Sequence, residues 1–191
     1  AGSCFELDNP NGPCKESFPS TSKDHFTWAK KSIRDWLFME CERLGIKGCW
    51  MRIFYAYGPY QRRNSLIPTL LSYFQKAAMP PVKAVENSND FIFVADVAEA
   101  FIKAINETSV EGTFHIGSGY STSVLELCKI SEKLVRNSST FSDKLSNLSK
   151  KNFGPVNFWS DNTHSRHVLN WSPSTSINDG INKTWQWLKK V

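Results

Sequence analysis

Residues 46–54 constrain the fold more than any other part of the sequence. They form a short apolar run without regular polar alternation, which is typical of a strand covered on both faces in a parallel sheet. A second strand is expected over residues 113–117, where it opens into a Gly-Ser-Gly turn. Helical segments precede, separate and follow these strands, and this alternation predicts an α/β fold with a parallel sheet.

Two of the predicted helices carry an apolar stripe at helical spacing. In residues 94–105 the stripe consists of Val94, Val97, Ala98, Phe101, Ile102 and Ile105. In residues 23–44 it consists of Ile33, Trp36, Leu37, Cys41 and Leu44, and Gly45 then ends the helix. We expect Asp96 to be the N-cap of the helix over residues 94–105, with a structural role.

Weaker signals predict the remaining elements. Further helices are expected over residues 66–78, over 123–135 after a capping box formed by Ser123 and Glu126, and from residue 176 onward. Residues 82–86 favour a short strand. The polar segment 137–152 is interpreted as mobile.

The predicted strands are too few for a complete parallel sheet. Residues 1–22 are rich in Pro, Gly, Asn and Ser and predict an irregular loop without a strand. A parallel sheet needs cover on both faces and neighbours at its edges. The sequence therefore predicts a partial doubly wound, Rossmann-like sheet whose first strands are absent.

Charge and cysteine usage exclude several classes of protein. The net charge of +5 favours anionic ligands such as nucleotide diphosphates, but no Lys/Arg block indicates nucleic-acid binding. Five cysteines without CxxC spacing argue against a disulfide framework and a zinc site, and fit a reducing cytoplasm. His164 and His167 lack a third metal ligand, so no metal is expected. No apolar run reaches the roughly 20 residues that span a bilayer.

Two segments carry a family resemblance. The sequences Met51-Arg-Ile-Phe-Tyr-Ala-Tyr-Gly-Pro59 and Asp90-Phe-Ile-Phe-Val-Ala-Asp-Val-Ala98 resemble the back half of an extended short-chain dehydrogenase/reductase, of the NAD-dependent nucleotide-sugar epimerase/dehydratase type. The resemblance runs from residue 2 to the C-terminus. It implies that residues 1–135 are the C-terminal part of a dinucleotide-binding fold with interleaved substrate-lobe segments, and that 136–191 complete a small substrate-binding lobe. The glycine-rich phosphate loop of the family is absent from the sequence.

The resemblance also implies a catalytic group. Relatives carry Tyr-x-x-x-Lys at the start of a helix, and the matching residues are Phe26-Thr-Trp-Ala-Lys30. In relatives the lysine lowers the pKa of the tyrosine phenol and holds the cofactor ribose, while a Ser or Thr orients the sugar; Ser3 matches that position. Phe26 has no exchangeable proton, and losing a general acid/base costs about 10²–10⁴ in rate. The chain is therefore a natural degenerate homologue, an enzyme with another acid/base, or an engineered Tyr→Phe variant.

Further contacts follow from the resemblance. The expected ligand is a nucleotide-diphosphate sugar, and the expected cofactor is NAD or NADP, whose binding by this chain alone is doubtful. Lys30 and Arg52 are assigned to the cofactor. The residues assigned to the substrate are Tyr55, Tyr57, Gly58, Arg62, Leu66 and Asn89, with Asn89 where relatives have a phosphate-binding Arg.

Two functions remain open at this point. One is an NAD(P)-dependent change at a sugar carbon by epimerisation, dehydration or reduction. The other is a catalytically inactive homologue that binds a nucleotide sugar or a partner. A homodimer formed through the 23–44 helix, with Trp28 and Trp36 in its interface, is a further expectation, and core packing explains the same stripe.

Overall fold

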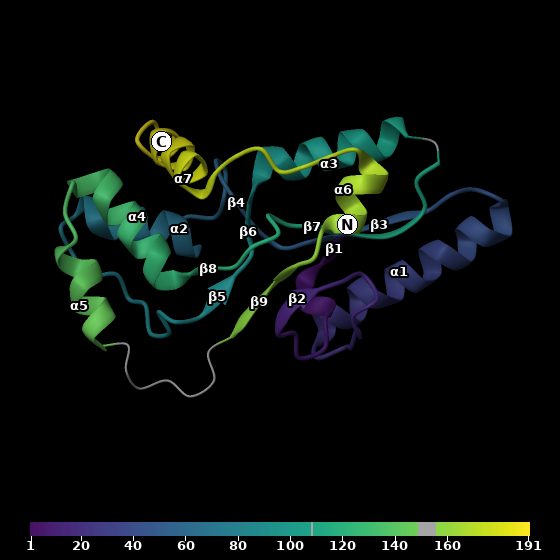
Figure 1. Ribbon diagram of the computed structural model, residues 1–191, viewed down its shortest axis with the longest axis horizontal. Coiled ribbons are helices and arrows are strands. Elements are labelled where there is room, and N and C mark those ends of the chain that lie inside the picture. Colours follow the sequence, from purple (N-terminus) through teal and green to yellow (C-terminus); the bar gives the residue numbers. More distant parts are fainter. Residues whose placement is uncertain (108, 149–155) are drawn as a thin grey trace.

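The computed structural model describes residues 1–107, 109–148 and 156–191 and has an α/β fold with parallel strand pairing (Figure 1). Its first sheet has the order β1 (Gly2–Ser3), β3 (Cys49–Ile53) and β7 (Gly112–Ile116), all parallel. Helix α1 (His25–Leu44) packs on β1, and helix α6 (Thr163–Leu169) packs on β7 and on α3 (Val94–Asn106). The predictions of an α/β class and of parallel strands within 46–54 and near 113–117 are confirmed.

Short strands build the rest of the pairing. One sheet has the order β2 (Gly12–Cys14), β9 (Asn157–Ser160), β5 (Ser88–Asn89) and β8 (Thr122–Ser123). A separate parallel pair joins β4 (Tyr55–Tyr57) to β6 (Phe91–Phe93). Strands of two to four residues are too short to show a side-chain period, so the sequence pattern does not reveal them.

Two strand predictions are wrong. Residues 1–22 contain β1 and β2 as well as the 3-10 helix η1 (Cys4–Glu6), rather than an irregular loop alone. Residues 82–86 form no strand; the chain bends and turns there, and Val85 is buried in the core of the lobe. Both errors have one cause, because these segments are ordered by partners that lie far along the chain, such as β9 beside β2.

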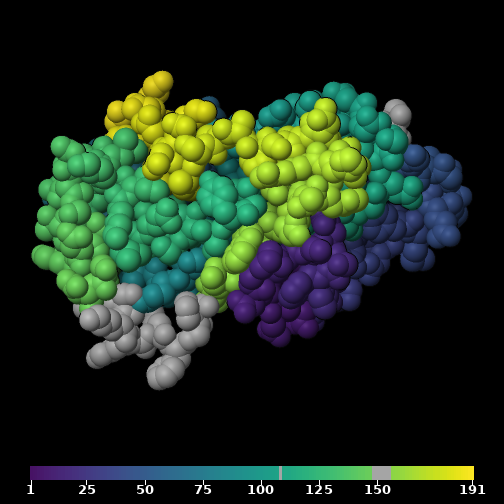
Figure 2. All heavy atoms as spheres, viewed as in Figure 1, coloured from purple at the N-terminus to yellow at the C-terminus, as the bar shows by residue number. Residues whose placement is uncertain are grey.

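The helical lobe consists of α2 (Leu66–Gln75), α4 (Val124–Arg136), α5 (Thr140–Leu148) and α7 (Ile177–Leu188), grouped at one end of the molecule (Figure 1). Its buried core includes Leu70, Phe74, Leu127 and Ile181. The opposite end holds the first sheet with α1 and α3, and Figure 2 shows the amino-terminal segment against the carboxy-terminal one, in agreement with the β2–β9 pairing.

Helix α5 overturns part of the prediction that 137–152 is mobile; residues 149–152 lie outside the described residues. The buried Glu132 carboxylate of α4 accepts hydrogen bonds from the backbone N–H groups of Phe141 (3.0 Å) and Ser142 (2.8 Å) in the first turn of α5. The carboxylate of another helix therefore caps the first turn of α5, and the local sequence pattern of α5 does not indicate such a cap.

Helix starts agree with the predicted caps in part. Helix α1 begins two residues later than predicted, because Asp24 and Thr27 form a reciprocal capping box. Ser123 accepts from the N–H of Glu126 at 3.0 Å, as predicted, but the described contacts of Glu126 include no reciprocal bond. Asp96 is not the N-cap of α3. It lies inside the first turn, where its buried carboxylate accepts hydrogen bonds from Ser174 and Thr175.

The apolar stripe of α1 is only partly covered. Cys41 is buried, whereas Ile33, Trp36 and Leu44 are 53%, 60% and 54% exposed. Core packing therefore accounts for Cys41 but not for these three exposed side chains. Among the described residues, no helix is long and apolar enough to cross a membrane.

Candidate functional site

Ser3 lies where β1 ends and η1 begins. It is the N-cap of η1, and its Oγ accepts a hydrogen bond from the Phe5 N–H at 3.3 Å. Its own N–H donates to Glu6 Oε1 at 2.7 Å. The backbone around Ser3 is therefore fixed by a capping box, at the carboxyl end of a parallel strand.

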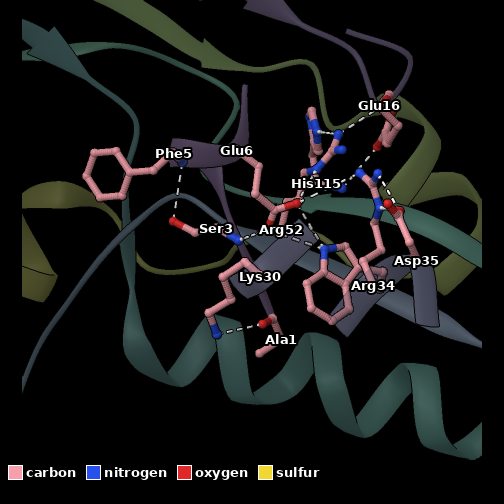
Figure 3. Close-up of polar contacts among 11 residues, drawn as sticks. Ala1, Ser3, Phe5, Glu6, Glu16, Lys30, Arg34, Asp35, Arg52 and His115 are labelled. Carbon is pink, nitrogen blue, oxygen red and sulfur yellow. Dashed lines mark hydrogen bonds and ion pairs between the residues drawn. The ribbon is translucent and has the colours of Figure 1, made fainter. Parts of the chain in front are cut away.

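Helix α1 brings Phe26 and Lys30 to the same end of the sheet, since it packs on both β1 and η1. The Lys30 ammonium lies 5.7 Å from the centroid of the Phe26 ring, because residues four apart share a helix face. The ammonium also donates to the Ala1 carbonyl oxygen at 2.9 Å. Figure 3 shows Lys30 reaching back from α1 toward the strand that carries Ser3.

A cavity of about 790 Å³ opens beside these residues. Its walls come from η1, residues 9–11, the start of α1, Tyr55 and strand β9; its lining residues are Cys4, Phe5, Leu7, Asn9, Pro10, Asn11, Lys23, Asp24, Phe26, Thr27, Tyr55, Val156, Asn157 and Phe158. A volume of this size is typical of small-molecule sites. Of the residues assigned from sequence, Phe26 and Tyr55 line it directly.

Aromatic rings form much of the cavity wall. The Tyr55 ring meets Phe5 edge to face at a centroid distance of 5.5 Å and lies 6.2 Å from Phe158. Asparagine side chains and Lys23, whose ammonium donates to the Leu7 carbonyl oxygen at 2.9 Å, add polar groups. The surface combines apolar faces with amide and ammonium donors, which is the composition of a site for an amphipathic ring compound.

Several ionisable groups of the cavity have shifted pKa values. Burial raises the pKa of the Cys4 thiol and of the Tyr55 phenol, so both stay protonated at neutral pH. Hydrogen bonds from Thr27 lower the pKa of Asp24, whose carboxylate caps α1. None of these three groups has a pKa tuned toward neutrality, where proton transfer is most efficient.

Other residues assigned from sequence lie away from the cavity. Tyr57 is buried, stacks edge to face on Phe93 and donates to the Ile177 carbonyl oxygen at 3.5 Å. Gly58 has a φ of 146° and packs against Val94, so a side chain there is strained. Leu66 packs on the core of the lobe.

Arg62 and Asn89 also lie outside the cavity lining. Arg62 is exposed in the loop before α2. Asn89 is half-buried on β5, and its Oδ1 has no hydrogen-bond partner among the described residues. Their assignment to a substrate stays a prediction.

Arg52 is buried in the sheet rather than exposed to the cavity. Its Nε donates to Glu6 Oε2 at 3.2 Å and its Nη1 to the Glu16 carbonyl oxygen at 3.1 Å (Figure 3). Burial lowers the pKa of its guanidinium, and Glu6 opposes that shift. These bonds give Arg52 a structural role inside the protein. Its assignment to the cofactor stays a prediction.

Glu6, Phe5 and residues 9–11 belong to the site or its surroundings but were not predicted from the sequence. No motif marks them, since Glu6 stands between the apolar residues Phe5 and Leu7, and residues 9–11 belong to the segment expected to be an irregular loop. The nearest signal is Ser3, because Phe5 and Glu6 follow it by two and three residues; Phe5 lines the cavity, whereas Glu6 is buried behind it.

Comparison with known proteins shows that the chain belongs to a family. The family model described as GDP-mannose 4,6 dehydratase matches residues 8–184. The chain is 25% identical over 187 residues to the dTDP-D-glucose 4,6-dehydratase of Mus musculus, covering 92% of this chain and 50% of that protein. It is 34% identical over 102 residues to the UDP-glucose 4-epimerase of Erwinia amylovora, covering 51% and 29%.

Solved structures show the same fold. A UDP-glucuronic acid 4-epimerase from Bacillus cereus in complex with NAD superposes with a TM-score of 0.83 at 19% identity, covering 99% of this chain and 58% of that one. A UDP-glucose 4-epimerase from Thermotoga maritima with UDP-glucose gives 0.81 at 20% identity, covering 99% and 62%. The chain thus spans about half the length of the curated relatives.

Proposed function

This chain belongs to the GDP-mannose 4,6 dehydratase family of NAD-dependent epimerases and dehydratases, and on that premise we propose that residues 1–191 form its nucleotide-sugar-binding half with the catalytic position at Phe26 disabled. One observation carries the proposal. The Lys30 ammonium lies over the Phe26 ring next to a ligand-sized cavity, and α1 packs on the strand that ends at Ser3.

The cavity supports a sugar nucleotide as the ligand. Sugar rings and bases present flat apolar faces that pack on Phe5, Tyr55 and Phe158, and their hydroxyl and carbonyl groups match asparagine amides. The related epimerase from Thermotoga maritima is solved with UDP-glucose. Ser3 and Lys30 are the residues we assign to the sugar carbon that would react.

The family implies NAD or NADP, which accepts and returns a hydride. Lys30 fits its ribose end, since the ammonium is exposed and has donors beyond the one used by Ala1. The sequence of 191 residues holds no glycine-rich loop for the phosphates. We therefore infer that binding of the dinucleotide needs a further βαβ unit, and that residues 1–191 alone convert no nucleotide sugar.

A non-enzymatic role is the second candidate, and the cavity's own chemistry favours it. Phe26 supplies no proton, Cys4 and Tyr55 have raised pKa values, and Asp24 is committed to its helix cap. A tyrosine-to-phenylalanine mutant of the Bacillus cereus epimerase was solved with both NAD and a fluorinated UDP-sugar. That protein holds its ligands with a Tyr→Phe change, which supports binding without turnover here.

Calorimetric titration with UDP-glucose and with dTDP-glucose tests the proposal. We expect saturable binding by the 191-residue chain that is weakened by Tyr55→Ala, because that change removes a wall of the cavity. Lys129→Gln, on the remote face of α4, is the matched control and should leave the affinity unchanged. Equal affinities of the Tyr55→Ala and Lys129→Gln variants, or no binding by the unmodified chain, would contradict the proposed site.

A second experiment separates the two candidate functions. Fused to a glycine-rich amino-terminal half from a relative, the Phe26→Tyr variant should convert nucleotide sugar about 10²–10⁴ times faster than the unmodified fusion. Comparable conversion by the unmodified fusion would mean that another group performs the proton transfer. Conversion by neither variant, with binding intact, would favour the non-enzymatic role.

We also propose a homodimer formed through α1, because several large apolar side chains of this helix are exposed. Trp28 and Trp36 are each 60% exposed, and Met39 is 66% exposed on the same helix. Exposed apolar surface of this extent on one helix is typical of an interface.

A further inference from the structure

Glu6 is a buried carboxylate that the proposed function does not use. It lies in η1, three residues after Ser3, and none of its surface is exposed. Its Oε1 accepts from the Ser3 N–H at 2.7 Å, and its Oε2 accepts from Trp50 Nε1 and from Arg52 Nε, both at 3.2 Å. Buried carboxylates are costly unless they are paired in this way, so the arrangement needs an explanation.

The contacts of Glu6 determine how the Ser3 hydroxyl is presented. Glu6 holds the Ser3 backbone, and the Phe5 N–H then occupies one acceptor lone pair of Ser3 Oγ at 3.3 Å. A hydroxyl also has one proton to donate. Among the described residues, a side-chain hydrogen bond joins Ser3 to the Cys4 sulfur, and no oxygen or nitrogen acceptor receives that proton. Sulfur is a weak acceptor, so the hydroxyl can donate to a ligand oxygen instead.

Glu6 also links this strand end to the helix that carries Lys30. The Glu6 Oε2 atom lies 3.9 Å from Arg34 Nη1, and the Arg34 side chain is 14% exposed. Arg34 follows Lys30 by one helical turn on the same face. Figure 3 shows Arg34 and Arg52 converging on the Glu6 carboxylate while Ser3 lies on its other side.

We propose that Glu6 is a positioning residue, which fixes the Ser3 hydroxyl relative to Lys30 so that both face the same ligand atom. This inference rests on the proposed function for its ligand. A carboxylate is needed because each of its oxygens accepts, whereas an amide offers one acceptor to the N–H groups of Ser3, Trp50 and Arg52. The neutral isostere therefore leaves at least one of these donors unpaired.

Glu6→Gln in the 191-residue chain tests the inference, with Glu16→Gln as the matched control. Glu16 belongs to the same polar network, where it accepts from the His115 N–H (3.1 Å) and from Ser165 Oγ (3.0 Å), and its described hydrogen bonds include none to Ser3 or α1. Hydrogen exchange of the Ser3 amide, measured by NMR, reports the positioning without any ligand. We expect it to become at least about tenfold faster in Glu6→Gln only.

A double-mutant cycle tests whether Glu6 acts through Ser3. UDP-glucose affinity should fall roughly three- to tenfold in Glu6→Gln, and by a similar factor in Ser3→Ala, as expected for one lost hydrogen bond. If Glu6 acts through Ser3, the double variant should be no weaker than Ser3→Ala. Additive losses would mean that Glu6 acts only on the fold, and would overturn the proposal.

The readouts distinguish failure of this inference from failure of the proposed function. If the unmodified chain binds no nucleotide sugar, the proposed function is wrong. The hydrogen-exchange rate of the Ser3 amide then still tests whether Glu6 positions Ser3. Unchanged Ser3 exchange in Glu6→Gln would overturn that role. If Glu6→Gln does not fold, Glu6→Asp keeps the charge for Arg52 but shortens the reach to Ser3, and the same selective acceleration is expected.

Discussion

Asp90→Asn is expected to lower the free energy of unfolding by about 2–5 kcal/mol. Asp90 is fully buried between β5 and β6. Its Oδ1 accepts from the N–H and the hydroxyl of Ser118, both at 2.6 Å, and its Oδ2 accepts from the Gly119 N–H (3.2 Å) and from Ser160 N–H (3.0 Å) and Oγ (2.6 Å). The carboxylate thus ties the turn after β7 to the end of β9, a strand that walls the cavity.

The magnitude follows from counting acceptors. An asparagine keeps the size of the side chain but replaces one oxygen with an NH₂ group. If the amide oxygen keeps Gly119 and Ser160, the Ser118 N–H loses its acceptor, which costs about 1–3 kcal/mol for a buried donor. The remaining bonds lose the strengthening by charge, which adds about 1–2 kcal/mol.

Urea unfolding monitored by tryptophan fluorescence measures this change. Asp143→Asn is the control, since Asp143 is exposed and its described bond is to Ser139 Oγ at 2.7 Å; its effect should stay within about 0.5 kcal/mol. In a thermal scan Asp90→Asn should lower the Tm by about 4–20 °C, at 2–4 °C per kcal/mol. A loss equal to that of the control would refute the assignment of Asp90 as a buried hydrogen-bond centre.

The remaining predictions concern acidity, packing and association. Burial lowers the pKa of His115 below its usual 6.5; the Glu16 charge opposes this shift and the Arg52 charge adds to it, so the unfolded chain takes the proton first. Stability should be full above pH 6.5 and fall below it by at most about 1.4 kcal/mol per pH unit, and His115→Gln should remove this slope. A flat urea midpoint between pH 7 and 5 would contradict this. Gly180→Ala places a methyl group against the Tyr57 phenol and should cost about 1–3 kcal/mol in urea, with partial recovery in combination with Tyr57→Phe. Trp36→Glu should convert a dimer to the 21.7 kDa monomer in sedimentation, and a monomeric unmodified chain would rule out the proposed α1 interface.

The candidate site was predictable to the extent that helical spacing and the family resemblance define it. The i, i+4 relation fixes Lys30 beside Phe26 wherever the helix lies, and the structure has that contact. Tyr55 lies in the cavity wall, whereas Tyr57 and Leu66 pack into the lobe and Arg52 is buried in the sheet. Whether a side chain faces a cavity or a core depends on what packs against its strand, and a strand of three residues such as β4 does not indicate this.

The sequence by itself determined the α/β class, the helices α1 to α4 and α7, the two longer parallel strands and the family. These features depend on local periodicity and caps, and an amphipathic period is a property of a single segment. Only the tertiary structure decided the short strands β2, β5, β8 and β9, helix α5 and the buried carboxylates Glu6, Asp90 and Glu132. Each of these is stabilised by donors or strands outside its own segment, such as Trp50 and Arg52 for Glu6, so the stabilisation appears only when those segments pack together.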